Sequence, residues 1–342
     1  MDEPVPADLM LGPATRLLWR APDSLHLGLG SAEVVVDGLP APVVRRFASP
    51  VPPAEPAPAL DAAARHALVA LAEAGYLWPR PREADDPRFA PPDPRLAGEL
   101  AALAVRHGED AARVLSARRH TTVEVRGAGR LAPHLAALLA AAGVRRVHCA
   151  VDGVAKLRHA TPGGVRVEDE GVALATAVEQ AIRRAAPDAD TTPLPVGERA
   201  DLTVLALDGP VPAERAATLH AADAPYLAVS LGLDHGVVGP LVLPGLTGCL
   251  RCAELHRRDR DPAWPALAVQ LTVERRHGPA SEVALATVIA GVAAQQALTF
   301  LDGGEPACID GTLELRLPDW RLRRRSWPAH AECGCCATDP AE

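Results

Sequence analysis

Five of the seven cysteines fall into two tight clusters that lie far apart in the chain. Cys249 and Cys252 are spaced as C-x-x-C, and the second cluster consists of Cys333, Cys335 and Cys336. Two thiolates at C-x-x-C spacing can reach one tetrahedral ion, and a second close pair can complete its four ligands. A metal bound in this way would join the tail to the body of a domain, so this pattern strongly constrains the fold.

We therefore expect a structural Zn²⁺ ion with four thiolate ligands, Cys249, Cys252, Cys333 and Cys335. Cys336 or His330 could replace one of the tail cysteines, and the sequence does not decide between them. Four thiolates leave no open position for water or substrate, which indicates an architectural role. The alternative is a set of buried or redox-active cysteines, but their clustering favours a metal.

Length, charge and hydropathy limit the other possibilities. The 342 residues are enough for two domains, and a net charge of −8 gives no reason to expect a nucleic-acid partner. The opening MDEPVPADLM lacks the apolar core of a secretory signal, which predicts a cytoplasmic protein with reduced thiols. Residues 283–301 approach the length of a membrane span, but Gln295, Gln296 and many alanines favour a buried core helix, so no membrane association is expected.

Residues 1–80 form the first predicted domain, a small α+β unit of the winged-helix kind. Short strands separated by turn residues are expected at 17–20, 25–29 and 33–36. A helix capped by Asp61 follows, and Gly75 ends it before a last short strand. Residues 81–118 are expected to form a linker rich in proline and charge, followed by a connecting helical region.

Residues 119–342 form the second predicted domain, in which strands alternate with helices. The strand expected at 202–207, LTVLAL, is apolar throughout. Apolar strands that alternate with helices are typical of an α/β fold with a parallel sheet covered on both faces. Residues 311–327 are expected to add an antiparallel hairpin that turns at Pro318 and Asp319.

A glycine turn joins the first strand and helix of this second domain. Gly127 and Gly129 lie in the sequence GAGRLA, at the place where an α/β protein binds nucleotide phosphates on helix-terminal amides. Asp152 ends the following strand, where a carboxylate could bond ribose hydroxyls. A tight turn beneath a packed helix needs glycines equally, so the residues alone leave both interpretations open.

The order of these segments resembles the ThiF/E1-like superfamily over roughly Arg118 to Cys336. The matching segments are the glycine turn, ADLTVLALDGP and VVGPLVLPGLTGCLRC. The resemblance implies an E1-like, Rossmann-type parallel sheet with a C-terminal zinc knuckle and hairpin. More narrowly, the front domain and the segments LHRRDRDPAWPALAVQL and RRRSWPAHAECGC resemble actinobacterial ThiF-family proteins of azol(in)e (TOMM) peptide biosynthesis. In that group the front domain is similar to a RiPP recognition element, which takes a leader peptide as an extra strand.

The same resemblance assigns roles in a nucleotide site. Gly127 and Gly129 would meet the phosphates of ATP, Asp152 the ribose, and Asp208 the Mg²⁺ ion. Arg130 belongs to the same loop and stands where active members have a second glycine, so its bulk would crowd the phosphates.

Positive charge for the leaving pyrophosphate is poorly represented in the sequence. Lys156 and Arg158 lie in the stretch where active members carry a basic group, but the next helix begins without Lys or Arg. Since acyl-adenylate formation needs preorganised positive charge, this pattern favours the loss of ATP chemistry.

Three functional hypotheses follow. The first is a non-catalytic or weakly catalytic scaffold that binds a precursor leader peptide and presents it to a partner, a YcaO-like cyclodehydratase. The alternative is an active ATP-dependent adenylyltransferase of the ThiF type that activates a C-terminal carboxylate. A nicotinamide oxidoreductase fits worst, because the cysteine knuckle has no role in hydride transfer. The resemblance also implies a homodimer.

Overall fold

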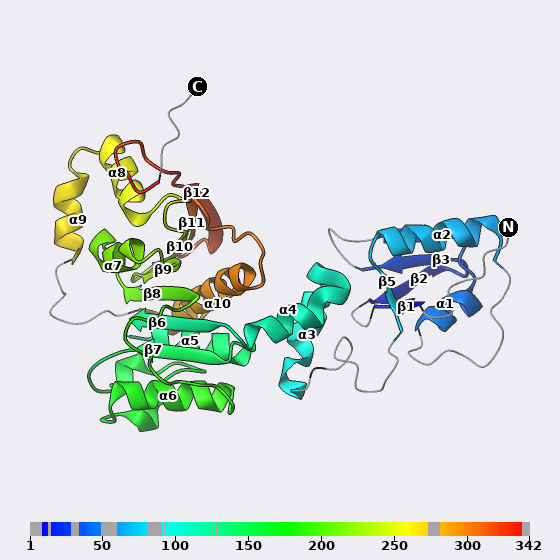
Figure 1. Ribbon diagram of the computed structural model, residues 1–342, viewed down its shortest axis with the longest axis horizontal. Helices are drawn as coiled ribbons and strands as arrows, with labels where there is room; N and C mark the ends of the chain where they lie inside the picture. Colours follow the sequence, from blue (N-terminus) through cyan, green and yellow to red (C-terminus); the bar gives the residue numbers. More distant parts are fainter. Residues whose placement is uncertain are drawn as a thin grey trace. The chain divides into compact units, whose positions relative to one another are not determined.

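The structure is a computed structural model that describes residues 9–12, 15–28, 34–48, 60–80, 91, 93–127, 129–272 and 281–336. Two compact units divide the chain, Met1–Ser116 and Ala117–Glu342, and each is considered by itself (Figure 1). Part of the linker predicted within 81–118, residues 81–90, lies outside the described residues, as do the ends of two predicted strands at 29 and 33.

The first unit contains two small antiparallel sheets and two helices that share a core. Its elements are β1 (Leu9–Leu11), β2 (Leu17–Ala21), β3 (Ser24–Leu27), β4 (Val34–Asp37), α1 (Ala41–Ala48), α2 (Ala62–Glu73) and β5 (Leu77–Pro79). One sheet has the order β2-β3-β4, and β1 pairs with β5. The predicted cap of α2 is present, because the Asp61 carboxylate accepts the N–H of Ala64 at 2.8 Å.

Two further helices complete the first unit, α3 (Ala97–His107) and α4 (Ala111–Arg118), and the latter runs across the division into the second unit. Trp78 from β5 packs with Leu100 and Leu103 of α3 and with Leu115 of α4. These contacts form a second, smaller core beside that of α1 and α2. The helical region expected before residue 118 is therefore present.

A seven-stranded sheet forms the centre of the second unit, with the order β12-β11-β10-β9-β8-β6-β7. The strands are β6 (Thr122–Gly127), β7 (Arg146–Ala150), β8 (Leu202–Asp208), β9 (Tyr226–Leu231), β10 (His235–Val242), β11 (Gly311–Arg316) and β12 (Arg321–Ser326). The strands β7, β6, β8 and β9 are parallel, whereas β10, β11 and β12 are antiparallel to their neighbours. The expected parallel sheet thus accounts for four strands, and the expected hairpin is β11 and β12.

Helices pack against both faces of this sheet. The helices are α5 (Leu131–Ala141), α6 (Leu174–Ala185), α7 (Ala217–Ala221), α8 (Leu250–Arg260), α9 (Trp264–Thr272) and α10 (Val283–Leu301). Successive residues of β8 point to opposite faces. Val204 and Ala206 join the cluster of α5, α6 and α10, whereas Leu205 joins that of α7 and α8. This alternation confirms the prediction of a doubly covered sheet (Figure 1).

The long apolar helix α10 lies in the core of the second unit. Among the residues that the structure describes, α10 is the one helix that is long and apolar enough to cross a membrane. Its residues Leu285, Ile289 and Ala293 are fully buried, and it packs against α5 and β10. Burial inside the protein accounts for its apolar composition, as expected from the sequence.

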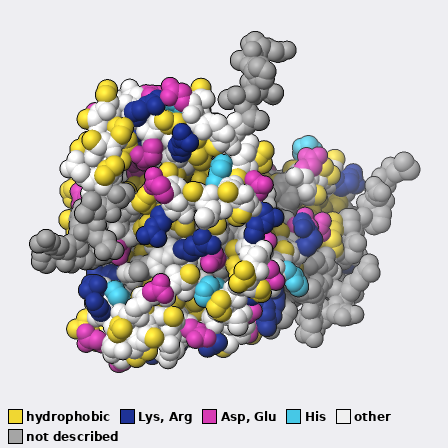
Figure 2. Space-filling model, turned by 60° about the vertical axis from the view of Figure 1, so that its left-hand side comes forward, with side chains coloured by type: hydrophobic (Ala, Val, Ile, Leu, Met, Phe, Trp, Pro, Cys, Tyr) yellow, Lys and Arg dark blue, Asp and Glu magenta, His cyan; other side chains and the backbone are white. Residues whose placement is uncertain are grey.

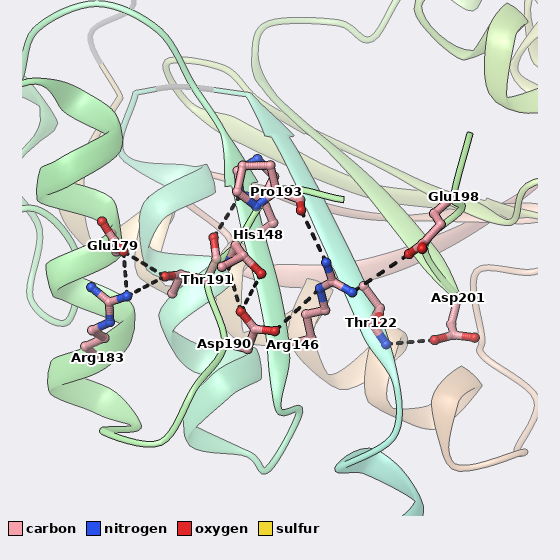
Figure 3. A network of polar contacts seen from close by, with 11 residues as sticks. Thr122, Arg146, His148, Glu179, Arg183, Asp190, Thr191, Pro193, Glu198 and Asp201 are labelled. Atoms are coloured by element: carbon pink, nitrogen blue, oxygen red, sulfur yellow. Dashed lines mark hydrogen bonds and ion pairs between the residues drawn. The ribbon is translucent and has the colours of Figure 1, made fainter. Parts of the chain in front are cut away.

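The segment after α6 covers the outer edge of β7 (Figure 3). Asp190 forms a parallel bridge to Arg146, and its carbonyl accepts the N–H of Val147 at 2.9 Å. His148 Nδ1 lies 3.1 Å from the carbonyl oxygen of Thr191. The Arg146 guanidinium lies between the carboxylates of Asp190 and Glu198 (Figure 3). A covered edge cannot pair with another chain.

Candidate functional site

Four cysteine side chains converge at one end of the second unit. The Sγ atoms of Cys249, Cys252, Cys333 and Cys335 all lie within 4.8 Å of one another. The Sγ of Cys252 lies 3.3 Å from that of Cys335, and the Sγ of Cys249 lies 3.5 Å from that of Cys333 and 3.8 Å from that of Cys252. Since a Zn–S bond measures about 2.3 Å, sulfurs at the corners of a tetrahedron lie about 3.8 Å apart. The four thiols therefore have the spacing to bind a metal ion.

Helix α8 and a turn in the tail position these thiols. Cys249 directly precedes α8 and Cys252 lies in its first turn, so the C-x-x-C spacing directs both side chains to the helix start. Gly334 has a φ of +66°, which glycine adopts without strain, and it lets the tail turn between Cys333 and Cys335. The backbone N–H of His330 donates to Cys252 Sγ at 3.3 Å, which ties the tail to the helix.

The two other candidate ligands point elsewhere. His330 uses both ring nitrogens, because Nε2 lies 2.8 Å from Asp259 Oδ2 and Nδ1 accepts the N–H of Glu332 at 3.1 Å. Cys336 Sγ donates to the carbonyl oxygen of Thr247 at 3.2 Å. The four candidate ligands that lie together in this structure therefore include neither His330 nor Cys336.

Burial opposes ionisation of these thiols unless a cation is present. Burial raises the pKa of Cys249 to about 11. Burial acts in the same direction on Cys252, but hydrogen bonds to its Sγ, above all from the backbone N–H of His330, lower the pKa of Cys252 overall. A bound cation deprotonates a thiol outright and replaces the proton, and soft thiolates suit Zn²⁺. The donor set therefore fits a metal ion better than it fits four free thiols.

The glycine turn between β6 and α5 is required by packing. A Cβ atom on Gly127 would lie 1.8 Å from the backbone oxygen of Ala206 in β8. A Cβ atom on Gly129, whose φ is +71°, would lie 1.8 Å from Asp208 Oδ2. The fold alone accounts for both glycines, so their presence does not by itself indicate a nucleotide.

Asp208, the last residue of β8, is the unusual group of this second site. Its Oδ1 atom is buried and has no hydrogen-bond partner among the residues that the structure describes. Burial raises the pKa of Asp208 to about 6, although the charges of Arg130 and Arg158 lower it. A buried carboxylate oxygen without a partner needs an explanation, and a bound cation such as Mg²⁺ is one that fits the chemistry.

Three cations surround the same region. Burial lowers the pKa of His159, and the charges of Arg158, Lys156 and Arg130 lower it further. Among the described residues none of these three cations forms an ion pair, and Arg130 donates to the backbone oxygen of Ser281. Two of these cations, Arg130 and Arg158, also lower the pKa of Asp208, so the structure places positive charge beside this carboxylate.

The remaining residues differ in their placement. Asp152 is exposed just beyond the end of β7, at the same end of the sheet as Asp208. We did not single out His134 and Thr161 from the sequence, yet both are buried, and His134 Nδ1 and Thr161 Oγ1 have no hydrogen-bond partner within the described part of the chain. A lone histidine among the apolar residues of a helix carries no signal that distinguishes it from the core.

Figure 2 shows how charge is distributed on one face of the molecule. Lys and Arg side chains are interspersed there with acidic and apolar ones. This mixed pattern agrees with the modest net charge of −8.

Comparison with known proteins identifies the fold. No family model matches the chain, and no curated protein matches it. The solved structure of E. coli MccB with AMPCPP and MccA matches with a TM-score of 0.72 and 16% identity, covering 96% of this chain and 99% of that one. E. coli MccB with ATP matches with a TM-score of 0.69 and 15% identity over the same shares.

Two further solved structures extend the comparison. One is the structure of MccB, the Microcin C7 biosynthetic enzyme, in complex with N-formylated MccA. PaaA matches with a TM-score of 0.59 and 15% identity, covering 76% of this chain and 90% of that one. At these identities the likeness concerns the fold alone. It supports the E1-like interpretation of the sequence, and the share of the chain that it covers extends into both units.

Proposed function

We propose that this protein binds a ribosomal precursor peptide and presents it to a partner enzyme, a YcaO-like cyclodehydratase of azol(in)e peptide biosynthesis. The first unit takes the leader peptide, and the E1-like unit serves chiefly as the scaffold. A homodimer and a cytoplasmic location belong to the same proposal. The proposal rests on the sequence resemblance and on one feature of the first unit, the edge of β4.

Strand β4 has the properties of a peptide-binding edge. It pairs with β3 on one side, and no other described strand pairs with it. Its Val34, Val35 and Val36 favour an extended backbone, and Val35 is 41% exposed. No Pro or Lys blunts this edge, which makes it a template for an added strand.

Helix α2 lies beside this edge. It packs against β4, and a Cβ atom on Gly38, just after the strand, would lie 3.2 Å from the Cβ of Ala63. A peptide added to β4 would therefore meet the helix with its side chains, while its backbone would bond to the strand. Main-chain bonds supply affinity in this mode, and side-chain contacts supply specificity.

For the cysteine centre we propose Zn²⁺, held by Cys249, Cys252, Cys333 and Cys335. Bound there, the ion would supply four metal–sulfur bonds that fasten the tail to α8. Purified protein with about one equivalent of zinc supports this assignment. Protein that is folded without zinc contradicts it.

Asp208 and its cations favour the second candidate function, ATP-dependent adenylation of a peptide carboxylate. In that case Asp208 would hold Mg²⁺, Asp152 the ribose, and the Gly127–Gly129 amides the phosphates. Arg130, Lys156 and Arg158 would balance the phosphate charge. The likeness in fold to MccB, which has been crystallised with ATP, agrees with this candidate.

Peptide binding and ATP–pyrophosphate exchange, measured side by side, separate the two candidates. We expect precursor peptide to bind with micromolar affinity or better, and binding to survive Asp208→Ala. Val35→Glu should weaken binding by about tenfold or more, because a charge on the edge opposes strand addition. Val105→Glu is the matched control, because Val105 is 70% exposed and lies on helix α3, which is not part of the sheet that contains β4.

The opposite results are equally clear. Absence of peptide binding, or equal binding by Val35→Glu and the unsubstituted protein, overturns the β4 proposal. Robust exchange that disappears in Asp208→Ala overturns the scaffold in favour of the adenylyltransferase.

A further inference from the structure

A fifth thiol lies next to the four-cysteine centre. Cys336 directly follows Cys335, and its Sγ lies 3.7 Å from Cys335 Sγ. This separation falls within the range between members of the centre itself, where neighbouring sulfurs are 3.3 to 3.8 Å apart. Cys336 is thus as close to one ligand as the ligands are to each other.

The backbone of Cys336 is held from a different side than that of the other tail cysteines. Cys336 forms a parallel bridge with Gly245, and its Sγ donates to the carbonyl oxygen of Thr247. Both partners belong to the segment that leads into Cys249. Cys336 therefore stays beside the first half of the centre through contacts that do not involve Cys335.

The centre also has an accessible side. Cys249 and Cys252 are buried, whereas Cys333, Cys335 and Cys336 are partly exposed. A ligand leaves a metal most readily where solvent or a competing ligand can reach it. Cys335 is such a ligand, and the nearest competing donor is the thiol of the next residue.

We propose that Cys336 is an exchange ligand of this metal centre, which binds the ion when Cys335 leaves it. In the exchange the Cys336 Sγ–H loses its proton, a new metal–sulfur bond forms, and the Cys335–metal bond breaks. The departing Cys335 thiolate takes up one proton, so the charge of the four-thiolate site is unchanged and no oxidant is needed. The ion therefore has four sulfur ligands both before and after the exchange.

This inference rests on the proposed metal centre and concerns a soft divalent ion such as Zn²⁺. An exchange ligand lets the protein retain the ion when one ligand is lost. It also gives a chelator or an acceptor protein a stepwise route to the ion, because one thiolate can be replaced without opening the whole site.

The test compares metal release from single and double variants of the full chain. Zinc transfer to a chromogenic chelator is followed in Cys335→Ser and in the double variant Cys335→Ser/Cys336→Ser. We expect the single variant to retain zinc and the double variant to release it at least about tenfold faster, as expected when a supporting donor is lost. The double variant Cys335→Ser/Cys308→Ser is the control for thiol number, because Cys308 is fully buried and outside the centre.

Cobalt provides a second readout that does not depend on rates. The thiolate-to-Co²⁺ charge-transfer band should retain its four-thiolate intensity in Cys335→Ser and drop only when Cys336 is also replaced. Equal release and equal spectra for the single and double variants overturn the exchange ligand. Absence of metal from the unsubstituted protein overturns the centre itself, so the two failures are distinguishable.

Discussion

The cysteine centre and the Asp208 site belong to the same unit, but they are built in different ways. The cysteine centre has four equivalent donors, two of them fixed by the first turn of α8. The Asp208 site has one buried carboxylate, two tightly packed glycines and two cations, Arg130 and Arg158, whose charges act on the carboxylate. The cysteine centre consists of metal-binding donors alone, whereas at the Asp208 site some residues are required for packing and others contribute charge.

This difference shows which features of a site can be attributed to a ligand. The four cysteines are soft thiol donors at distances that suit one metal ion, so their convergence indicates a metal. Gly127 and Gly129 are already required by β8, so only the unpaired oxygen of Asp208 and its neighbouring cations indicate a ligand. The following variants test this contrast, beginning with the largest expected effect.

Replacing Cys252 by Ser should have the largest effect. Cys252 is fully buried, and the loss of its thiolate should remove the metal and lower the free energy of unfolding by about 3 kcal/mol or more. Metal analysis and urea unfolding measure both quantities. Cys308→Ser, at an equally buried thiol outside the centre, should keep the metal. If Cys252→Ser retains stoichiometric metal, the centre is not a four-thiolate site.

Replacing Gly127 by Ala should lower the free energy of unfolding by about 3 kcal/mol, at the upper end for overpacking. The added Cβ would lie 1.8 Å from a backbone oxygen of β8, which cannot rotate away. Gly153→Ala is the control, because its φ is +92° but no atom lies within 4 Å, so only backbone strain of about 1 kcal/mol is expected. Equal losses in urea unfolding would mean that packing on β8 does not explain Gly127.

The pH dependence of stability should report on Asp208. Because burial raises its pKa to about 6 in the folded protein, the folded state binds more protons than the unfolded state between about pH 4 and 6. Stability should therefore fall as pH rises through this window, by about 2–3 kcal/mol at 1.36 kcal/mol per pH unit. Asp208→Asn should abolish this fall.

Urea midpoints between pH 4 and 7, without added divalent cations, measure the effect in both proteins. A curve that has the same slope with and without Asp208 would show that another group titrates. A fall that Mg²⁺ suppresses would show that the ion stabilises the ionised carboxylate.

The smallest effect is expected for Arg158→Gln. The charge of Arg158 lowers the pKa of Asp208, so its removal should shift the fall in stability to higher pH without removing it. Arg166→Gln is the control, because Arg166 does not contribute to the pKa of Asp208. An unchanged midpoint would mean that Arg158 is too well solvated to act on the carboxylate.

The sequence predicted the elements of this fold wherever a local signal was strong. Asp61 caps α2, the apolar run of 202–207 became β8, and the helix of residues 283–301 lies in the core. It predicted the antiparallel hairpin of β11 and β12, but it did not predict that β10 would run antiparallel to β9 and join this hairpin to the parallel sheet. Strand direction depends on pairing between distant segments, and hydrophobic pattern alone does not encode it.

By itself the sequence determined the two cysteine clusters, the glycine turn and the carboxylate at the end of β8, because each follows from local spacing or strand position. Only the tertiary structure decided which four thiols converge and that Arg130, Lys156 and Arg158 act on one buried region. Convergence requires distances between residues far apart in the chain. The ionisation of Asp208 likewise depends on burial, which exists only in the folded protein.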